Sequence, residues 1–144
     1  MYVMLPLTTK LILWAMFLQV FLTMFVLFRL GMVRKKALDD KAVTWGEIAT
    51  NHSAWPDYAL KVYNNFVNQF EIPVLFYVGV LTALLLNQNS WAVVILCWVF
   101  VISRWIHMYI HTGSNYIPHR YKIFLLGFIS LALLWLYLAI KVTF

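Results

Sequence analysis

Four long apolar stretches separated by short polar segments set the pattern of this chain. They predict membrane-spanning helices at about residues 9–30, 57–86, 91–111 and 120–141, with a connecting loop over residues 33–56. The second and third connections are short, so neighbouring helices should run antiparallel. The sequence therefore predicts an all-α integral membrane protein, an antiparallel four-helix transmembrane bundle, in which residues 1–144 form a single membrane domain.

Composition supports this fold class. The 144 residues are 64% hydrophobic and 11% charged, which is too few charges to cover the surface of a water-soluble domain of this size. The net charge of +6 does not indicate nucleic acid as a partner, because the basic residues gather at helix ends, where lipid headgroups lie. Cys97 is the only cysteine, which excludes a disulfide framework. The apolar run after Lys10 is too long for a signal-peptide core, so we expect a retained span.

Basic residues also predict the orientation. Nine of the eleven lysines and arginines lie toward the ends that carry loops one and three, and only Lys10 and Lys141 lie toward the other side. The positive-inside rule then places loops one and three in the cytoplasm and both termini outside. A bacterial inner membrane is the expected location, although a protein of the endoplasmic reticulum would show the same topology.

The second span is polar in its first half. Its apolar part, Ile72–Leu86, has 15 residues, whereas a span needs about 20, so polar residues must enter the bilayer. At 100° per residue, one side of the helix carries Lys61, Asn64, Asn68 and Glu71, and the adjoining flank carries Asn65 and Gln69. Such residues must face protein or a wet cavity, and they are functional candidates. Pro73 predicts a kink near Gln69.

The third span repeats this feature with Arg104, His107 and His111 on one face. Counted from the turn at residues 87–90, Glu71 and Arg104 lie at nearly the same depth, which predicts a buried ion pair between them. Arg120 and His119 begin the fourth span at the same level. Cationic groups from three elements should therefore meet in one pocket that suits an anionic ligand.

Two other interpretations remain open at this point. The polar cluster could be packing glue between membrane helices. His107 and His111 have a spacing that can hold a metal, but only His52 and His119 stand elsewhere and no second His-x-x-x-His follows, so no metal is expected.

The polar motifs resemble a known family, the membrane-associated proteins in eicosanoid and glutathione metabolism (MAPEG), which includes the microsomal glutathione transferases. The matching residues are Asn68-x-x-Glu71 with Pro73, Arg104-x-x-His107-x-x-x-His111, and Asn115 with Arg120. The resemblance covers the whole chain in order.

The resemblance implies a homotrimer that binds glutathione, as a substrate, between subunits near the cytoplasmic face. It implies that Arg120 stabilises the thiolate, and we expect Lys61, Asn64, Asn68, Glu71, His107 and His111 to hold the tripeptide. Arg104 is expected to be structural, in the ion pair with Glu71. The activity implied is a transferase or peroxidase reaction on hydrophobic electrophiles or lipid hydroperoxides, with the lipid bilayer and a small hydrophobic substrate as partners.

Three positions depart from the family's usual pattern. Asn64 stands where an arginine is usual, Lys61 replaces another arginine, and His111 replaces a common tyrosine. An amide cannot form the bidentate carboxylate clamp of an arginine. The alternative is therefore a non-catalytic member that binds a lipid or a partner membrane protein through the same cleft.

Overall fold

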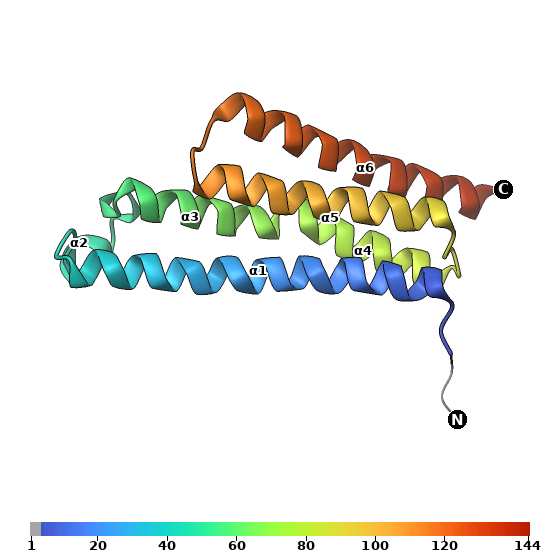
Figure 1. Cartoon of the computed structure of the whole chain (residues 1–144), viewed down its shortest axis with the longest axis horizontal. Helices are drawn as coiled ribbons and strands as arrows, with labels where there is room; N and C mark the ends of the chain where they lie inside the picture. Colours follow the sequence, from blue (N-terminus) through green and yellow to red (C-terminus); the bar gives the residue numbers. More distant parts are fainter. Residues whose placement is uncertain (1–3) are drawn as a thin grey trace.

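A computed structural model describes residues 4–144, which form a long bundle of helices (Figure 1). The elements are α1 (Leu7–Asp39), α2 (Trp45–Ile48), the 3₁₀ turn η1 (His52–Ala54), α3 (Asp57–Val67), the 3₁₀ turn η2 (Asn68–Phe70), α4 (Ile72–Leu85), α5 (Trp91–Thr112) and α6 (Ile117–Thr143). Within residues 4–144 there is no strand, and four helical segments are long and apolar enough to cross a membrane. The predicted all-α four-helix membrane bundle is confirmed.

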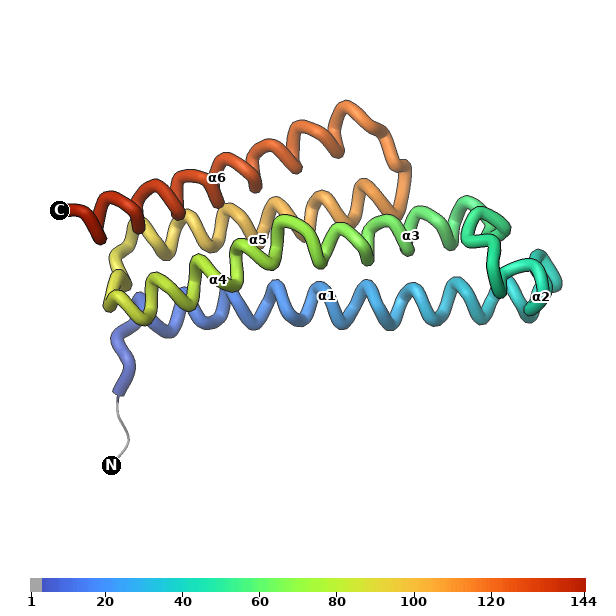
Figure 2. The backbone as a smooth tube through the Cα atoms, turned by 180° about the vertical axis from the view of Figure 1, so that it is seen from behind, coloured from blue at the N-terminus to red at the C-terminus, as the bar shows by residue number. Residues whose placement is uncertain are grey.

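The central helix of the bundle is α5, which packs against α1, α3 and α6 (Figure 2). A core of buried apolar side chains joins α1, α4, α5 and α6, and Phe76 stacks on Phe100 within it at 4.5 Å between ring centroids. The start of α1 and the end of α6 lie at one end of the bundle, and the α1–α3 and α5–α6 connections lie at the other (Figure 1). The helices therefore alternate in direction.

The first and last helices are longer than predicted. Helix α1 continues past Gly31 to Asp39, nine residues beyond the expected end at residue 30. Its last turns are held by a small apolar cluster in which Ala37 packs with Val43 and Trp55. Helix α6 begins at Ile117 rather than near residue 120, because Pro118 occupies the first turn, where its missing N–H costs nothing.

The second span is broken where its polar half meets its apolar half. Helix α3 ends at Val67, η2 follows, and Glu71 takes a non-helical conformation with φ −96° and ψ −106° before α4 begins. Pro73 lies in the first turn of α4, where it needs no hydrogen-bond acceptor. The predicted kink is present, as a full interruption between residues 68 and 71.

Candidate functional site

A polar cleft lies beside the break in the second span. Toward the connection between α5 and α6, the two helices diverge (Figures 1 and 2). The cleft there has a volume of about 240 Å³ and is lined by Asn68, His107, Ile117, Arg120, Tyr121 and Phe124. Asn68 comes from η2, His107 from α5 and Arg120 from the first turns of α6. The structure thus brings together three of the predicted site residues.

His107 is the polar group in this cleft that lacks partners. Its side chain is 4% exposed, and neither Nδ1 nor Nε2 has a hydrogen-bond partner in residues 4–144. Its ring packs edge-on against that of His111, with the centroids 5.4 Å apart. A buried polar group without a partner costs free energy, so a ligand that pairs with the imidazole would regain it.

Arg120 is positioned by the loop that precedes α6. Its Nη1 donates a 2.6 Å hydrogen bond to Oδ1 of Asn115. Asn115 has a φ of 53°, a left-handed conformation that asparagine tolerates better than most residues. This anchor orients one edge of the guanidinium and leaves its other N–H donors available to an anion in the cleft.

The predicted ion pair between Glu71 and Arg104 is not formed. Among residues 4–144 the only ion pair joins Lys35 to Asp39, and Glu71 is exposed. Arg104, which is 2% exposed, instead donates from Nη2 to the backbone oxygen of Asn68 at 3.3 Å. The reason is the break in the second span. It frees the Asn68 carbonyl at the end of α3 as an acceptor, and it leaves the Glu71 side chain exposed.

The buried polar side of the second span is the flank that carries Asn65 in α3 and Gln69 in η2, which are 0% and 1% exposed. Gln69 Nε2 donates to Oδ1 of Asn65 at 3.3 Å, and Asn65 Nδ2 lies 3.4 Å from Nδ1 of His111. Gln19, which is 0% exposed in the middle of α1, donates from Nε2 to Oε1 of Gln69 at 3.1 Å. These four side chains form a buried polar row across α1, α3 and α5.

Sequence reasoning did not assign a role to this row. Within the apolar run Leu11–Phe28, Gln19 and Thr23 are the only polar side chains. The isolated amide of Gln19 is the feature of the sequence that could have indicated this row. An amide at such a depth must find a partner inside the protein. The row ends at His111, so it fixes the ring that packs on His107 beside the cleft.

Lys61, Asn64 and Glu71, three further predicted site residues, do not line the cleft. Asn64 and Glu71 are exposed and Lys61 is half-buried. Asn64 contributes only its backbone oxygen, which accepts a 2.9 Å hydrogen bond from Nδ2 of Asn68. Their roles in ligand binding stay predictions.

His107 and His111 lie one turn apart, and no group of three histidine, cysteine or acidic side chains suited to a metal occurs within residues 4–144. The metal-enzyme interpretation therefore gains no support from the arrangement of these side chains.

A family model for the MAPEG family matches residues 12–140, nearly the whole chain and all four spans. The chain belongs to the MAPEG family. No curated protein and no solved structure matched in the corresponding searches. Membership agrees with the four apolar helices and makes the chain an integral membrane protein of a family associated with glutathione and eicosanoid metabolism. In this MAPEG chain, the cleft of Asn68, His107 and Arg120 is the candidate site for that chemistry.

Proposed function

We propose that this MAPEG protein is a membrane-bound glutathione-dependent transferase or peroxidase that acts on hydrophobic electrophiles or lipid hydroperoxides. The observation that carries the proposal is the meeting of Arg120 with His107, whose ring nitrogens have no hydrogen-bond partner within residues 4–144, in one cleft beside the break in the second span. A cation and a buried imidazole suit an anionic, polar ligand better than a lipid tail.

Arg120 would supply the chemical activation. A guanidinium close to a thiol favours the thiolate over the thiol, and the thiolate is the nucleophile. In a transferase reaction the sulfur forms a bond to the electrophilic carbon while the leaving group departs with its electron pair. In a peroxidase reaction the thiolate sulfur bonds to one oxygen of the hydroperoxide as the O–O bond breaks, and the lipid alkoxide leaves and is protonated to the alcohol. The sulfenic acid formed on glutathione then reacts with a second glutathione thiol, which gives glutathione disulfide and water.

The size of the cleft supports a ligand shared between subunits. At about 240 Å³ it is smaller than the roughly 300–1,000 Å³ typical of ligand pockets, so one subunit would enclose only part of a tripeptide. Asn64 and Glu71 are exposed and Lys61 is half-buried on the second span, so a neighbouring copy could contact all three side chains. In a homotrimer with the site between subunits, the small cleft of one copy and the side chains of Lys61, Asn64 and Glu71 of the next copy would together surround the ligand.

The apolar wall of the cleft suits the second substrate. Ile117, Tyr121 and Phe124 line the α6 side, and Ile117 and Tyr121 are also strongly exposed on the outer surface of the subunit. In a bilayer that surface meets lipid or a neighbouring subunit. A hydrophobic electrophile dissolved in the membrane would approach the thiolate from this side.

Titration calorimetry of glutathione into the detergent-purified protein tests the proposal. Arg120→Ala should weaken binding or abolish thiol-dependent turnover of a chlorodinitrobenzene electrophile and a lipid hydroperoxide. Lys122→Ala is the matched control, because it removes a cation from the same helix that does not line the cleft. Equal behaviour of the two variants, or no binding at millimolar glutathione, would refute the assignment.

The alternative is a non-catalytic protein that binds a lipid or a partner membrane protein through the cleft. The position of Asn64 favours it, because an exposed amide stands where the family usually has an arginine. A protein of this kind would show no thiol-dependent turnover in any variant. It would instead retain a lipid or partner that Arg120→Ala releases.

A further inference from the structure

A second cavity, separate from the cleft, lies at the end of α1 where the chain folds back through α2. It has a volume of about 630 Å³ and is lined by Gly31, Arg34, Lys35, Leu38, Asp39, Trp45, Ile48 and Trp55. The α1 residues among these recur at helical spacing, so one face of the helix forms a wall. We propose that this cavity binds the headgroup of an anionic phospholipid.

The cavity is held open by a folded lobe. Helix α1 ends in a turn in which Lys41 has a φ of 55° and the Ala42 N–H donates to the Ala37 oxygen at 2.9 Å. Helix α2 is then started by a capping box between Thr44 and Glu47. Behind the cavity, Trp55 is 8% exposed and packs in the apolar cluster that includes Ala37. The walls are therefore fixed by local hydrogen bonds and by packing.

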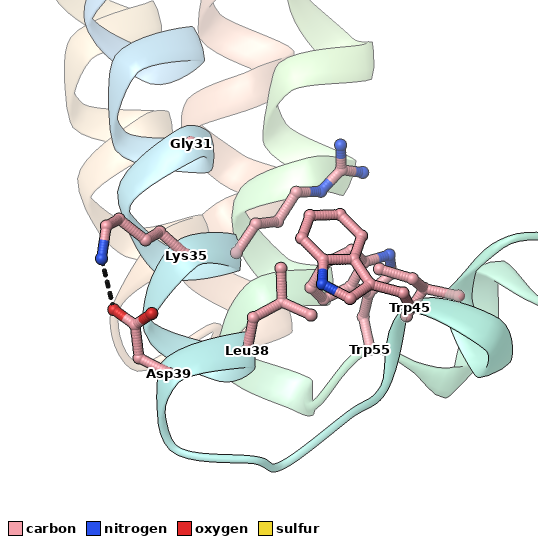
Figure 3. Close-up of a pocket in the computed structure, with 8 residues that line it drawn as sticks. Gly31, Lys35, Leu38, Asp39, Trp45 and Trp55 are labelled. Carbon is pink, nitrogen blue, oxygen red and sulfur yellow. Dashed lines mark hydrogen bonds and ion pairs between the residues drawn. The ribbon is translucent and has the colours of Figure 1, made fainter.

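The lining carries an ion pair at one edge and aromatic rings on the opposite side. Figure 3 shows Lys35 joined to Asp39 at one edge, with Trp45 and Trp55 on the opposite side and Leu38 between them. Trp45 is 74% exposed and projects away from the core. Tryptophan is enriched at the membrane interface, where its ring meets the region between headgroups and acyl chains. Such a lining matches a molecule with a charged head and an apolar body.

Arg34 carries the charge that is available to a ligand. The Lys35 ammonium is already paired, at 2.5 Å, with Asp39. The Arg34 guanidinium lies 5.1 Å from the centroid of the Trp55 ring and 5.5 Å from that of Tyr63, and no described residue accepts a hydrogen bond from it. Aromatic contacts hold the guanidinium in place but satisfy none of its N–H donors. A phosphate diester would accept two of these bonds at once.

The depth of the cavity fits the headgroup layer. The apolar run of α1 ends at Phe28, and Arg34 lies six residues further along the same helix. At ~1.5 Å per residue this is about 9 Å along the helix beyond the hydrocarbon edge, at the outer boundary of the polar layer of a bilayer. The long side chain of Arg34 can reach back from there to the headgroup phosphates.

Native mass spectrometry tests the proposal on the full-length protein, exchanged into mixed phosphatidylglycerol and phosphatidylcholine of equal chain length. The wild type should retain phosphatidylglycerol preferentially. Arg34→Gln should lower that preference roughly tenfold, because it removes a charge-assisted pair of hydrogen bonds. Lys36→Gln is the matched control, since Lys36 lies on the same helix but outside the cavity. Equal losses in the two variants would mean diffuse surface attraction and would overturn the proposal.

Two further variants keep the test decisive if Arg34→Gln folds poorly. Arg34→Lys retains the charge but loses the planar guanidinium. It should therefore weaken specific binding of the headgroup, whereas a diffuse electrostatic attraction would be unchanged. Trp45→Ala removes an exposed wall without entering the core, and it should lower the total amount of lipid retained. Glycerol phosphate added alone should fail to displace the lipid. Full displacement by it would assign the cavity to a free phosphate and contradict the lipid assignment.

Discussion

Amide side chains, rather than ion pairs, hold the polar interior of this bundle together. Gln19, Gln69 and Asn65 are each fully or almost fully buried and pass hydrogen bonds from α1 through α3 to His111 on α5. Within the membrane-embedded part of a protein, such amides have no water with which to form hydrogen bonds. Each link therefore stabilises the relative position of two helices, and the last link sets the histidine beside the cleft.

Replacing Gln69 by leucine should destabilise the protein by about 1–2 kcal/mol, because Gln19 and Asn65 both lose a partner in a buried site. Asn64→Leu is the control, since this side chain is exposed and makes no side-chain hydrogen bond. Unfolding in mixed detergent, followed by circular dichroism, measures the difference. If the two variants unfold at the same midpoint, the buried row does not stabilise the bundle.

A second prediction concerns the absence of an ion pair at Arg104. Glu71→Gln should change the free energy of unfolding by no more than about 0.5 kcal/mol, because the carboxylate is exposed and unpaired. Arg104→Leu should cost more, since it removes the donor to the freed Asn68 carbonyl. The same unfolding assay measures both variants. If Glu71→Gln and Arg104→Leu lower the free energy of unfolding equally, the buried ion pair predicted from the depth of the two residues would be supported.

The sequence predicted neither the exact partner of Arg104 nor the sides on which the polar residues of the second span lie. Counting along two antiparallel helices brought Arg104 to the level of Glu71, whereas Arg104 donates to the backbone oxygen of Asn68, three residues earlier. The rotation about the helix axis could not be predicted, because η2 and the non-helical Glu71 interrupt the 100° step on which the count relies. Asn65 and Gln69 were therefore assigned to the flank although they face the interior.

At the scale of elements, the divergence of α6 from α5 opens the cleft, and close packing joins the two helices further along. Gly127 on α6 lies directly against the Ser103 hydroxyl of α5, so an added Cβ would overlap it. Ser103 in turn donates a 2.6 Å hydrogen bond to the Phe100 oxygen. Glycine allows this close approach, which sets where the two helices part.

Gly127→Ala should destabilise the bundle by roughly 1–3 kcal/mol, because the new methyl group must displace Ser103 or the helix itself. Gly31→Ala offers a matched control in α1, where nothing lies within 4 Å of the added Cβ. This control should stabilise the protein by about 0.5–1 kcal/mol through lower backbone entropy in the unfolded state. Thermal unfolding in one detergent measures whether Gly127→Ala lowers the stability of the protein and Gly31→Ala raises it.

The element boundaries show which signals a sequence carries clearly. Pro73 predicted the break in the second span, since its ring excludes an ordinary helix interior. The extension of α1 past Gly31 was not predicted. One glycine costs a helix only ~1 kcal/mol, and the packing of Ala37 against Val43 and Trp55 outweighs that cost. Tertiary contacts of this kind cannot be read from the local pattern.

At the scale of the whole molecule, the α5–α6 connection beside the cleft and the lobe at the end of α1 lie toward the same end of the bundle (Figure 1). Most of the cations also lie toward this end. Orientation in the membrane therefore decides whether the cleft opens toward the cytoplasm, since its lining residues come from η2, the last turns of α5 and the first turns of α6.

Cysteine labelling of intact cells tests this orientation. Ser53→Cys and Ser114→Cys, in the two connections near the cleft, should resist a membrane-impermeant maleimide until the cells are permeabilised. Gln88→Cys and Thr143→Cys, at the other end, should react at once. The native Cys97 gives little background, because it is fully buried in the core. The reverse labelling pattern would place the cleft outside the cytoplasm, where a thiol cosubstrate would have to be supplied by another route.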